Sequence, residues 1–195
     1  VGDVDMLDLL RESLRQRPDY IVVGEVRGKE AYILFQQMAT GHPSLATIHA
    51  ESISKLLDRL TTQPISLPKS LVGSLDLIVF LLRVRHDNKF VRRVNEVLEI
   101  VSFDSNADQP IVNQVFRWNP VNDLYEVPNK STVLQKISEN TGIKPQDLID
   151  EFERRALVLS WMKEQNITDY QSVHKIINMY YASPKHVLAT IMGER

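Results

Sequence analysis

The chain begins with apolar positions at helical spacing and then switches to short, continuous apolar runs. Residues 5–16 carry a loose helical stripe, which ends at Pro18. The β-branched and aliphatic runs 20–24 and 44–48 predict strands, and we expect the first to be buried on both faces. Further helices are predicted over residues 29–40, 52–61 and 68–75. This alternation predicts an α/β domain with a mostly parallel sheet, in which residues 77–84 form a third strand.

The middle of the chain alternates between apolar and polar residues. The alternation covers residues 90–101 and 112–118, with a polar loop over 104–110, and residues 124–127 can pair with the second segment. Period-two patterns separated by short polar loops are typical of antiparallel strands with one solvated face. We therefore expect a β-meander here.

The last third of the chain has helical periodicity. Helices are predicted over residues 133–140, 145–165, 168–181 and 183–192, with Pro145 and Pro184 at first helical positions. The apolar stripe of the longest helix is Leu148, Phe152, Leu159 and Met162. Thr168 and Gln171 have the spacing of a capping box. Several short helices in series predict a small bundle.

Size and composition narrow the class of protein. The chain has 195 residues, a net charge of −2 and no cysteine, so it offers neither a disulfide scaffold nor a global basic excess for nucleic acid. Residues 77–82 form the longest aliphatic run, which is too short to span a bilayer, and no signal peptide is recognisable. Because the chain opens at Val1 and reaches a helix almost at once, we expect it to be the C-terminal part of a longer protein.

Two polar residues follow the predicted parallel strands. Glu25 comes just after the first strand, and His49 comes just after the second, so both are expected at one edge of the sheet, where open α/β sheets bind ligands. A carboxylate there can orient water or hold hydrated Mg²⁺, and a neutral imidazole can donate to a γ-phosphate. The alternatives are a solvated carboxylate for Glu25, a helix-cap neighbour for His49 and a loop histidine for His42.

Two longer motifs contain these residues. Residues 14–28, LRQRPDYIVVGEVRG, resemble the Walker B region of the secretion ATPase superfamily, and residues 41–50, GHPSLATIHA, resemble its His box. With RLTTQPI at 59–65, the match looks most like the archaeal branch. The family powers type II secretion, type IV pili and archaeal flagella. The resemblance implies the C-terminal part of a RecA-like P-loop NTPase core, a β-meander extension and a C-terminal helical subdomain, which we assign to residues 1–103, 104–128 and 129–195.

The resemblance also implies roles for five residues. Glu25 corresponds to the glutamate that polarises the attacking water and lies near Mg²⁺, which it is expected to contact through a water molecule. His49 corresponds to the γ-phosphate sensor, and His42 to the other histidine of the box. Arg15 falls where relatives place an arginine that acts across the subunit interface; the alternative is an arginine that satisfies helix C-terminal carbonyls. Arg27 is expected to hold the loop.

One required motif is missing. Among the seven glycines no pair has the Gly-x-x-x-x-Gly-Lys-Ser/Thr spacing of a phosphate-binding loop, so the P-loop half of the core is absent. ATP and Mg²⁺ would both require that half. We therefore expect this chain by itself to be inactive.

The resulting hypothesis is a homo-hexameric, ATP-hydrolysing motor in the cytoplasm, at the inner face of the membrane, acting on a membrane platform protein without inserting itself. The alternatives are a non-catalytic scaffold subunit of the same machinery and a DNA-translocation or DNA-uptake ATPase. Basic residues gather between Arg83 and Arg93, for which we favour a solvated hairpin over a contact with an acidic partner loop or nucleic acid. No nucleic-acid partner is expected.

Overall fold

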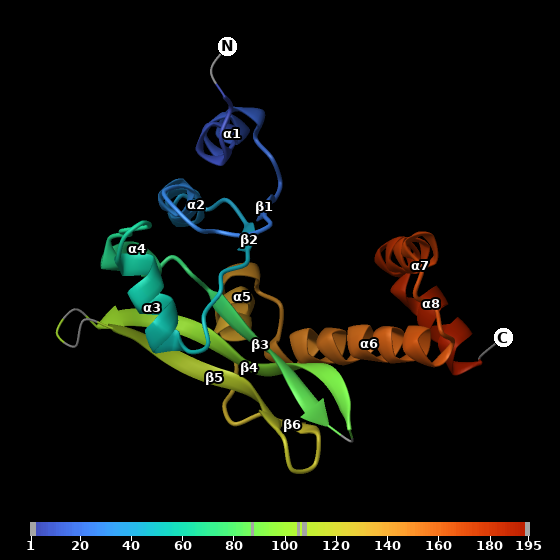
Figure 1. Cartoon of the computed structure of the whole chain (residues 1–195). Helices are drawn as coiled ribbons and strands as arrows, with labels where there is room; N and C mark the ends of the chain where they lie inside the picture. The colour runs from blue at the N-terminus through green and yellow to red at the C-terminus, as the bar shows by residue number, and fades with distance from the viewer. Residues whose placement is uncertain (1–2, 87, 105, 107–108, 194–195) are drawn as a thin grey trace. The chain divides into compact units, whose positions relative to one another are not determined.

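A computed structural model describes residues 3–86, 88–104, 106 and 109–193. The chain forms two compact units, residues 1–133 and 134–195, and each is considered by itself. Figure 1 shows the elements in chain order. The functional division at residues 103 and 128 remains a prediction.

The first unit contains most of the strands. Its elements are α1 (Met6–Ser13), η1 (Leu14–Gln16), β1 (Ile21–Val23), α2 (Glu30–Ala39), β2 (Ser44–Ala46), α3 (Ile53–Thr61), α4 (Lys69–Val72), β3 (Leu77–His86), β4 (Lys89–Asp104), β5 (Gln109–Asn119) and β6 (Leu124–Glu126). The remaining elements are α5 (Thr132–Thr141), which begins at the boundary, α6 (Pro145–Glu164), α7 (Tyr170–Ala182) and α8 (Pro184–Met192). The α/β class and the predicted helices are confirmed.

The parallel part of the fold is a pair of short strands. β1 and β2 pair in parallel, with Ile21 opposite Ser44 and Val23 opposite Ala46. Ile21 and Val23 share a core with α2, whereas the side chain between them, Val22, is 70% exposed. The expectation that this strand is buried on both faces is therefore wrong for the described residues, because only one face of the pair is covered.

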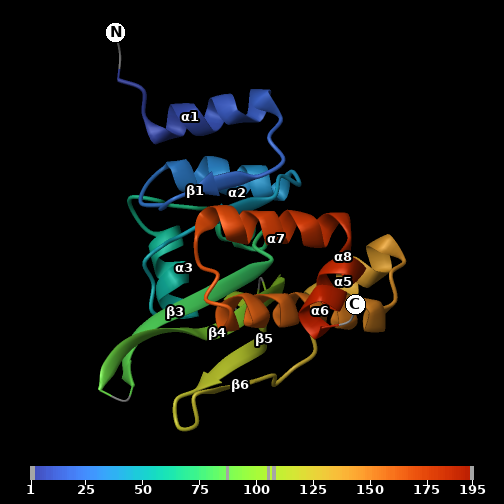
Figure 2. The same ribbon diagram turned by 90° about the vertical axis from the view of Figure 1, so that its right-hand side faces the viewer.

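The second sheet is an antiparallel meander in the order β3-β4-β5-β6. The predicted meander is confirmed, but residues 77–84 are not a third strand of the parallel sheet. They belong to β3, which pairs antiparallel with β4 over its whole length, from Leu77 opposite Glu99 to His86 opposite Lys89. A connection this short between β3 and β4 permits only a hairpin, since parallel neighbours need a long crossover. Figure 2 shows the two strands running side by side.

A buried carboxylate fastens this sheet to the start of α5. Glu99 on β4 is 1% exposed. Its oxygens accept the Thr132 N–H and hydroxyl, both at 2.6 Å, the Asn113 amide at 2.9 Å and the Ser131 hydroxyl. Burial raises the pKa of Glu99, but these hydrogen bonds outweigh burial, and the net pKa lies below its ordinary value. Glu99 is therefore ionised and fully bonded.

The second unit is a helical cluster with a small core formed by Val158, Met162, Tyr180 and Val187. The predicted stripe of α6 is partly wrong, since Phe152 and Leu159 are exposed. None of the helices in the described residues has the length and apolar character needed to cross a membrane.

The start of α7 also differs from the prediction. Asp169, rather than Thr168, is the N-cap, and its carboxylate accepts the Ser172 N–H at 2.9 Å. The predicted capping box was placed one residue early. The Thr168–Gln171 spacing matched the motif, but the neighbouring aspartate offers a stronger acceptor at the same spacing.

Candidate active site

The candidate site lies where β1 and β2 end. Beyond the last paired residues the segments that follow the two strands stay hydrogen-bonded to each other. Val26 N–H donates to the Thr47 carbonyl at 2.9 Å, and the Thr47 hydroxyl donates to the Gly24 carbonyl at 2.5 Å. These bonds hold the residues after each strand side by side. As a result, Glu25 Oε1 and His49 Nε2 lie 3.2 Å apart.

Glu25 lies between two basic side chains. Arg27 Nη2 donates to Glu25 Oε2 at 2.5 Å, on the side away from His49. The hydrogen bond from Arg27 lowers the pKa of Glu25; burial opposes it, and the charges of Arg27, His49 and Arg59 add to it. The carboxylate is therefore ionised near neutral pH.

The two oxygens of Glu25 are not equivalent. Oε2 is bonded to Arg27, whereas Oε1 is buried and accepts no hydrogen bond within the described part of the chain. His49 is close to Oε1, but its side chain is 79% exposed, so it can turn outward without unpacking a core. A buried, ionised oxygen that lacks a donor is chemically suited to a water molecule.

Arg27 is held by a second carboxylate. Glu30 Oε1, at the first position of α2, accepts the backbone N–H groups of Arg27 at 2.6 Å and Gly28 at 2.8 Å. Burial raises the pKa of Glu30, whereas the hydrogen bonds from these two N–H groups lower it. The hydrogen bonds have the larger effect, so the net pKa lies below its ordinary value. A Cβ atom at Gly28 would lie 3.0 Å from Glu30 Oε2. Glycine therefore lets the carboxylate approach the backbone that positions Arg27.

The other two predicted residues lie apart from Glu25. His42 is in the connection from α2 to β2, and its Nδ1 is 3.2 Å from the Thr40 hydroxyl. Arg15 is in η1, is 81% exposed and forms an ion pair of 3.8 Å with Glu12. Within the described residues the structure thus brings together Glu25, Arg27 and His49, and joins neither His42 nor Arg15 to them.

Comparisons with known proteins connect this geometry to a family. The sequence profile of the family described as "Type II/IV secretion system protein" matches residues 1–140. The chain belongs to that family. It is similar to an uncharacterized protein of Methanocaldococcus jannaschii, with 40% identity over 182 residues, which cover 89% of this chain and 67% of the relative.

Two relatives have descriptive names. The probable conjugal transfer protein TrbB of Sinorhizobium fredii is 40% identical over 106 residues, 51% of this chain and 31% of the relative. The type II secretion system protein E of Pectobacterium carotovorum is 44% identical over 70 residues, 34% of this chain and 14% of the relative. The matched segments are thus small parts of these two longer proteins.

The described part of this secretion-family chain contains no cluster of three or more histidine, cysteine, aspartate or glutamate side chains that could hold a metal. Glu25 is a single carboxylate, and one of its oxygens is already bonded to Arg27. Such a residue can contact a hydrated Mg²⁺ through water but cannot by itself form the ion's coordination shell, which prefers six oxygens.

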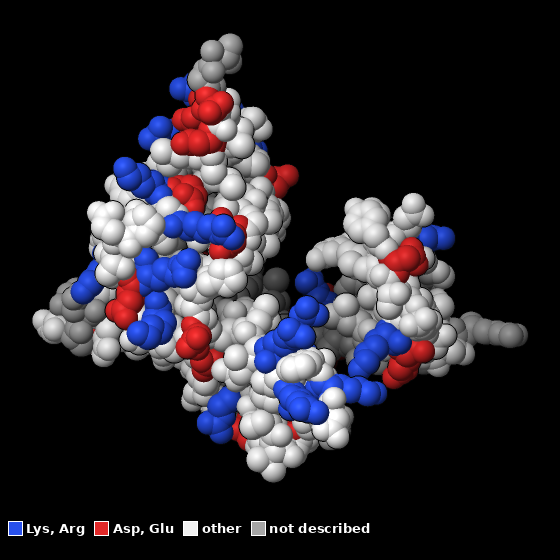
Figure 3. All heavy atoms as spheres, in the orientation of Figure 1, with Lys and Arg blue, Asp and Glu red and all other residues white. Residues whose placement is uncertain are grey.

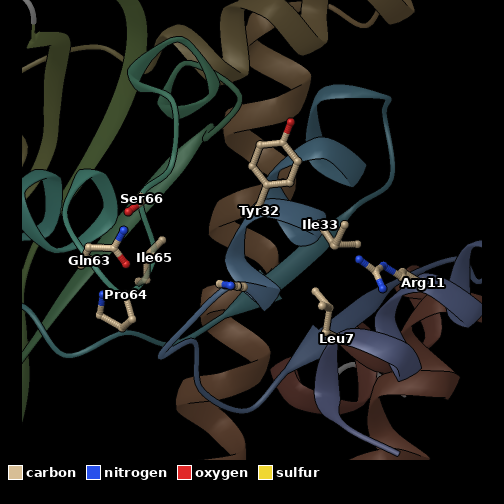
Figure 4. Close-up of a pocket in the computed structure, with 9 residues that line it drawn as sticks. Leu7, Arg11, Tyr32, Ile33, Gln63, Pro64, Ile65 and Ser66 are labelled. Atoms are coloured by element: carbon tan, nitrogen blue, oxygen red, sulfur yellow. The ribbon is translucent and has the colours of Figure 1, made fainter.

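The secretion-family chain also has a surface pocket of about 290 Å³, shown in Figure 4. It is lined by Leu7, Arg11, Lys29, Tyr32, Ile33, Gln63, Pro64, Ile65 and Ser66. Neither Glu25 nor His49 lines it. This pocket is therefore not part of the candidate site.

Sequence reasoning missed Glu30. The available signal was a glutamate in the first turn of the helix predicted over residues 29–40, directly after a glycine and a lysine. A carboxylate there is favoured by the unpaired N–H groups of a helix start.

Proposed function

We propose that this chain carries the water-polarising half of the active site of an ATP-hydrolysing secretion motor. The observation that carries the proposal is the approach of Glu25 Oε1 to within 3.2 Å of His49 Nε2 at the carboxyl ends of two parallel strands. Family membership supports a role in secretion or conjugation machinery.

The chemistry follows from the two oxygens of Glu25. Arg27 holds Oε2 and thereby fixes the rotation of the carboxylate. Oε1 then accepts a hydrogen bond from the attacking water and aligns its lone pair with the γ-phosphorus. Because the pKa of Glu25 is lowered, the residue orients the water more than it removes its proton. His49 donates from its exposed ring to a γ-phosphate oxygen.

The remaining parts of the site lie outside this sequence in our proposal. ATP supplies the phosphoryl group and Mg²⁺ neutralises its charge, and both need the backbone amides and lysine of a phosphate-binding loop. In the described residues β2 pairs only with β1, and β3 pairs only with β4, so each has an edge available for a further strand. We propose that a strand carrying this loop completes a RecA-like core there, and that this chain alone does not hydrolyse ATP.

The assembly is part of the same proposal. We place the motor in the cytoplasm as a homo-hexamer against a membrane platform protein, with Arg15, exposed on η1, at the subunit interface.

Similarity to a conjugal transfer protein favours a second cargo, nucleic acid moved between cells, with the same ATPase chemistry. A knockout that abolishes secretion or pilus assembly but leaves DNA transfer intact would decide for the first cargo.

The test is Glu25→Gln in the longer protein that includes a phosphate-binding loop. We expect nucleotide binding to persist and turnover to fall by roughly a hundred to ten thousandfold, because the amide cannot polarise water as a carboxylate does. Steady-state phosphate release and fluorescent-nucleotide binding measure the two effects.

The matched control is Glu126→Gln, which makes the same change at a carboxylate that pairs with Arg117 on the meander. Its turnover should stay near that of the unsubstituted protein. Near-normal turnover of Glu25→Gln would reject Glu25 as the catalytic residue. Phosphate release by the 195-residue chain alone, abolished by Glu25→Gln, would overturn the claim that the chain is incomplete.

A further inference from the structure

The β3–β4 hairpin has two faces of different chemistry. The register places Arg83 opposite Arg92, Arg85 opposite Phe90 and Leu81 opposite Val94, so these side chains share one face. The other face carries Arg93 and His86, which lie opposite Leu82 and Lys89. We call the set Leu81, Arg83, Arg85, Phe90 and Arg92 the arginine face.

In the described part of the chain the second face has an acidic partner, Asp123. Asp123 accepts two hydrogen bonds of 2.8 Å from Arg93, accepts one from the Trp118 indole and lies 3.9 Å from His86. The hydrogen bonds from Arg93 and Trp118 lower the pKa of Asp123 well below its ordinary range. The charge of Arg93 is therefore balanced within the chain.

The arginine face has no such acidic partner among the described residues. Arg83 stacks over the Phe90 ring at 4.5 Å, and Arg85 donates to the Asn88 side chain at 3.3 Å. In the described part of the chain no ion pair joins Arg83, Arg85 or Arg92 to a carboxylate. Figure 3 shows Lys and Arg side chains gathered over the end of β3.

This arrangement costs stability in the isolated chain. Like charges directly opposite each other in an antiparallel pair are destabilising, and Arg83 and Arg92 are such a pair. Exposed aromatic and aliphatic side chains beside them add apolar surface in water, since Phe90 is 67% and Leu81 is 71% exposed. An anionic partner that also covers apolar surface would offset both the repulsion between the arginines and the exposure of the apolar side chains.

We propose that the arginine face is the docking surface for an acidic segment of a partner protein, whose carboxylates pair with Arg83, Arg85 and Arg92 and whose apolar side chains cover Leu81 and Phe90. The exposed Leu81 favours protein over nucleic acid, because phosphates and bases make little use of an exposed leucine. The net charge of −2 likewise gives no long-range attraction for nucleic acid. This inference is independent of ATP hydrolysis.

The experiment measures binding of a short fluorescein-labelled peptide in which glutamate and leucine alternate, by fluorescence anisotropy at low and high salt. The 195-residue chain should bind it, and binding should weaken as salt screens the charges. Arg83→Glu with Arg92→Glu should weaken binding by at least about tenfold. The control Lys55→Glu with Lys136→Glu, which reverses two exposed lysines that belong to α3 and α5 rather than to the hairpin strands, should leave affinity unchanged.

A single substitution separates binding from folding. Arg92→Glu replaces the like-charged cross-strand pair with an ion pair to Arg83, so the melting temperature should not fall while peptide affinity does. A purely structural role for Arg92 would instead lower the melting temperature.

Three results would overturn the proposal. The first is no binding of the acidic peptide, and the second is equal binding of a version with lysine in place of glutamate. The third is tighter binding of single-stranded oligothymidylate than of the acidic peptide at the same salt, which would make the arginine face a nucleic-acid surface.

Discussion

Glu25 and Glu99 show how differently two ionised carboxylates can be used. Glu25 keeps one oxygen without a hydrogen-bond donor in the described residues, whereas Glu99 is buried and accepts four hydrogen bonds. The first arrangement leaves bonding capacity for a reacting molecule. The second uses all of it to join β4, β5 and the start of α5.

Glu99→Gln should lower the free energy of unfolding by about 2 kcal/mol at pH 7, because the amide loses the charge that its donors stabilise and turns an NH₂ group toward the Ser131 hydroxyl, which donates to the carboxylate. Since the folded pKa of Glu99 lies below its ordinary value of 4.5, its stabilisation is present above pH 4.5 and lost as the pH falls through the lower folded value. Urea unfolding between pH 7 and acid pH measures both effects. Glu12→Gln on α1, an exposed glutamate, should change stability by less than about 0.5 kcal/mol.

Sequence could predict the neighbourhood of Glu25 and His49 but not the environment of Glu99. Glu25 and His49 each follow an apolar run, and parallel strands bring such positions to one edge. Glu99 looks like any polar residue of an alternating strand. Its donors lie 14 to 33 residues further along the chain, and no local sequence pattern predicts them.

At the scale of elements, the helices, the parallel pair and the meander were predictable, but the sheet to which β3 belongs was not. Periodicity and proline placement located α6 and α8, because both signals are local. The apolar run of β3 is compatible with a parallel or an antiparallel sheet. What decides its partner is the short connection from β3 to β4. The cap of α7 depends on which of two adjacent acceptors reaches Ser172.

Asp169→Ala should reduce the folding equilibrium constant of the second unit about fivefold, since α7 loses its N-cap acceptor. Thr168→Ala, the matched change at the neighbouring position, should have a much smaller effect. Urea titrations followed by far-UV circular dichroism compare the two. An equal loss for both variants would contradict the assignment of Asp169 as the cap.

At the scale of the whole molecule, the two units have separate cores. The core of the first contains Leu34, Leu60 and Phe80, and that of the second contains Met162 and Tyr180. We therefore expect them to unfold as separate cooperative units. The sequence predicted a change from α/β to helical structure along the chain, but not that the meander and the parallel pair share one core.

Met162→Ala should destabilise the second unit by about 3 kcal/mol through the cavity it leaves. Hydrogen exchange should then speed up in α6, α7 and α8, while the amides of β4 and β5 keep their protection. Leu60→Ala should give the opposite pattern, with faster exchange confined to the first unit. Equal acceleration in both units by either variant would show that they unfold together.

The contact of Glu30 with the start of α2 has a consequence for anion binding. Helix N-termini commonly hold phosphate or sulfate ions on their free N–H groups. Here the Glu30 carboxylate already accepts the N–H groups of Arg27 and Gly28, which directly precede α2, so a negative charge already occupies this end of the helix. A sulfate or nucleotide phosphate would have to displace it. We expect that shortening this side chain would leave these two N–H groups free to bind an anion, only a few residues from Glu25.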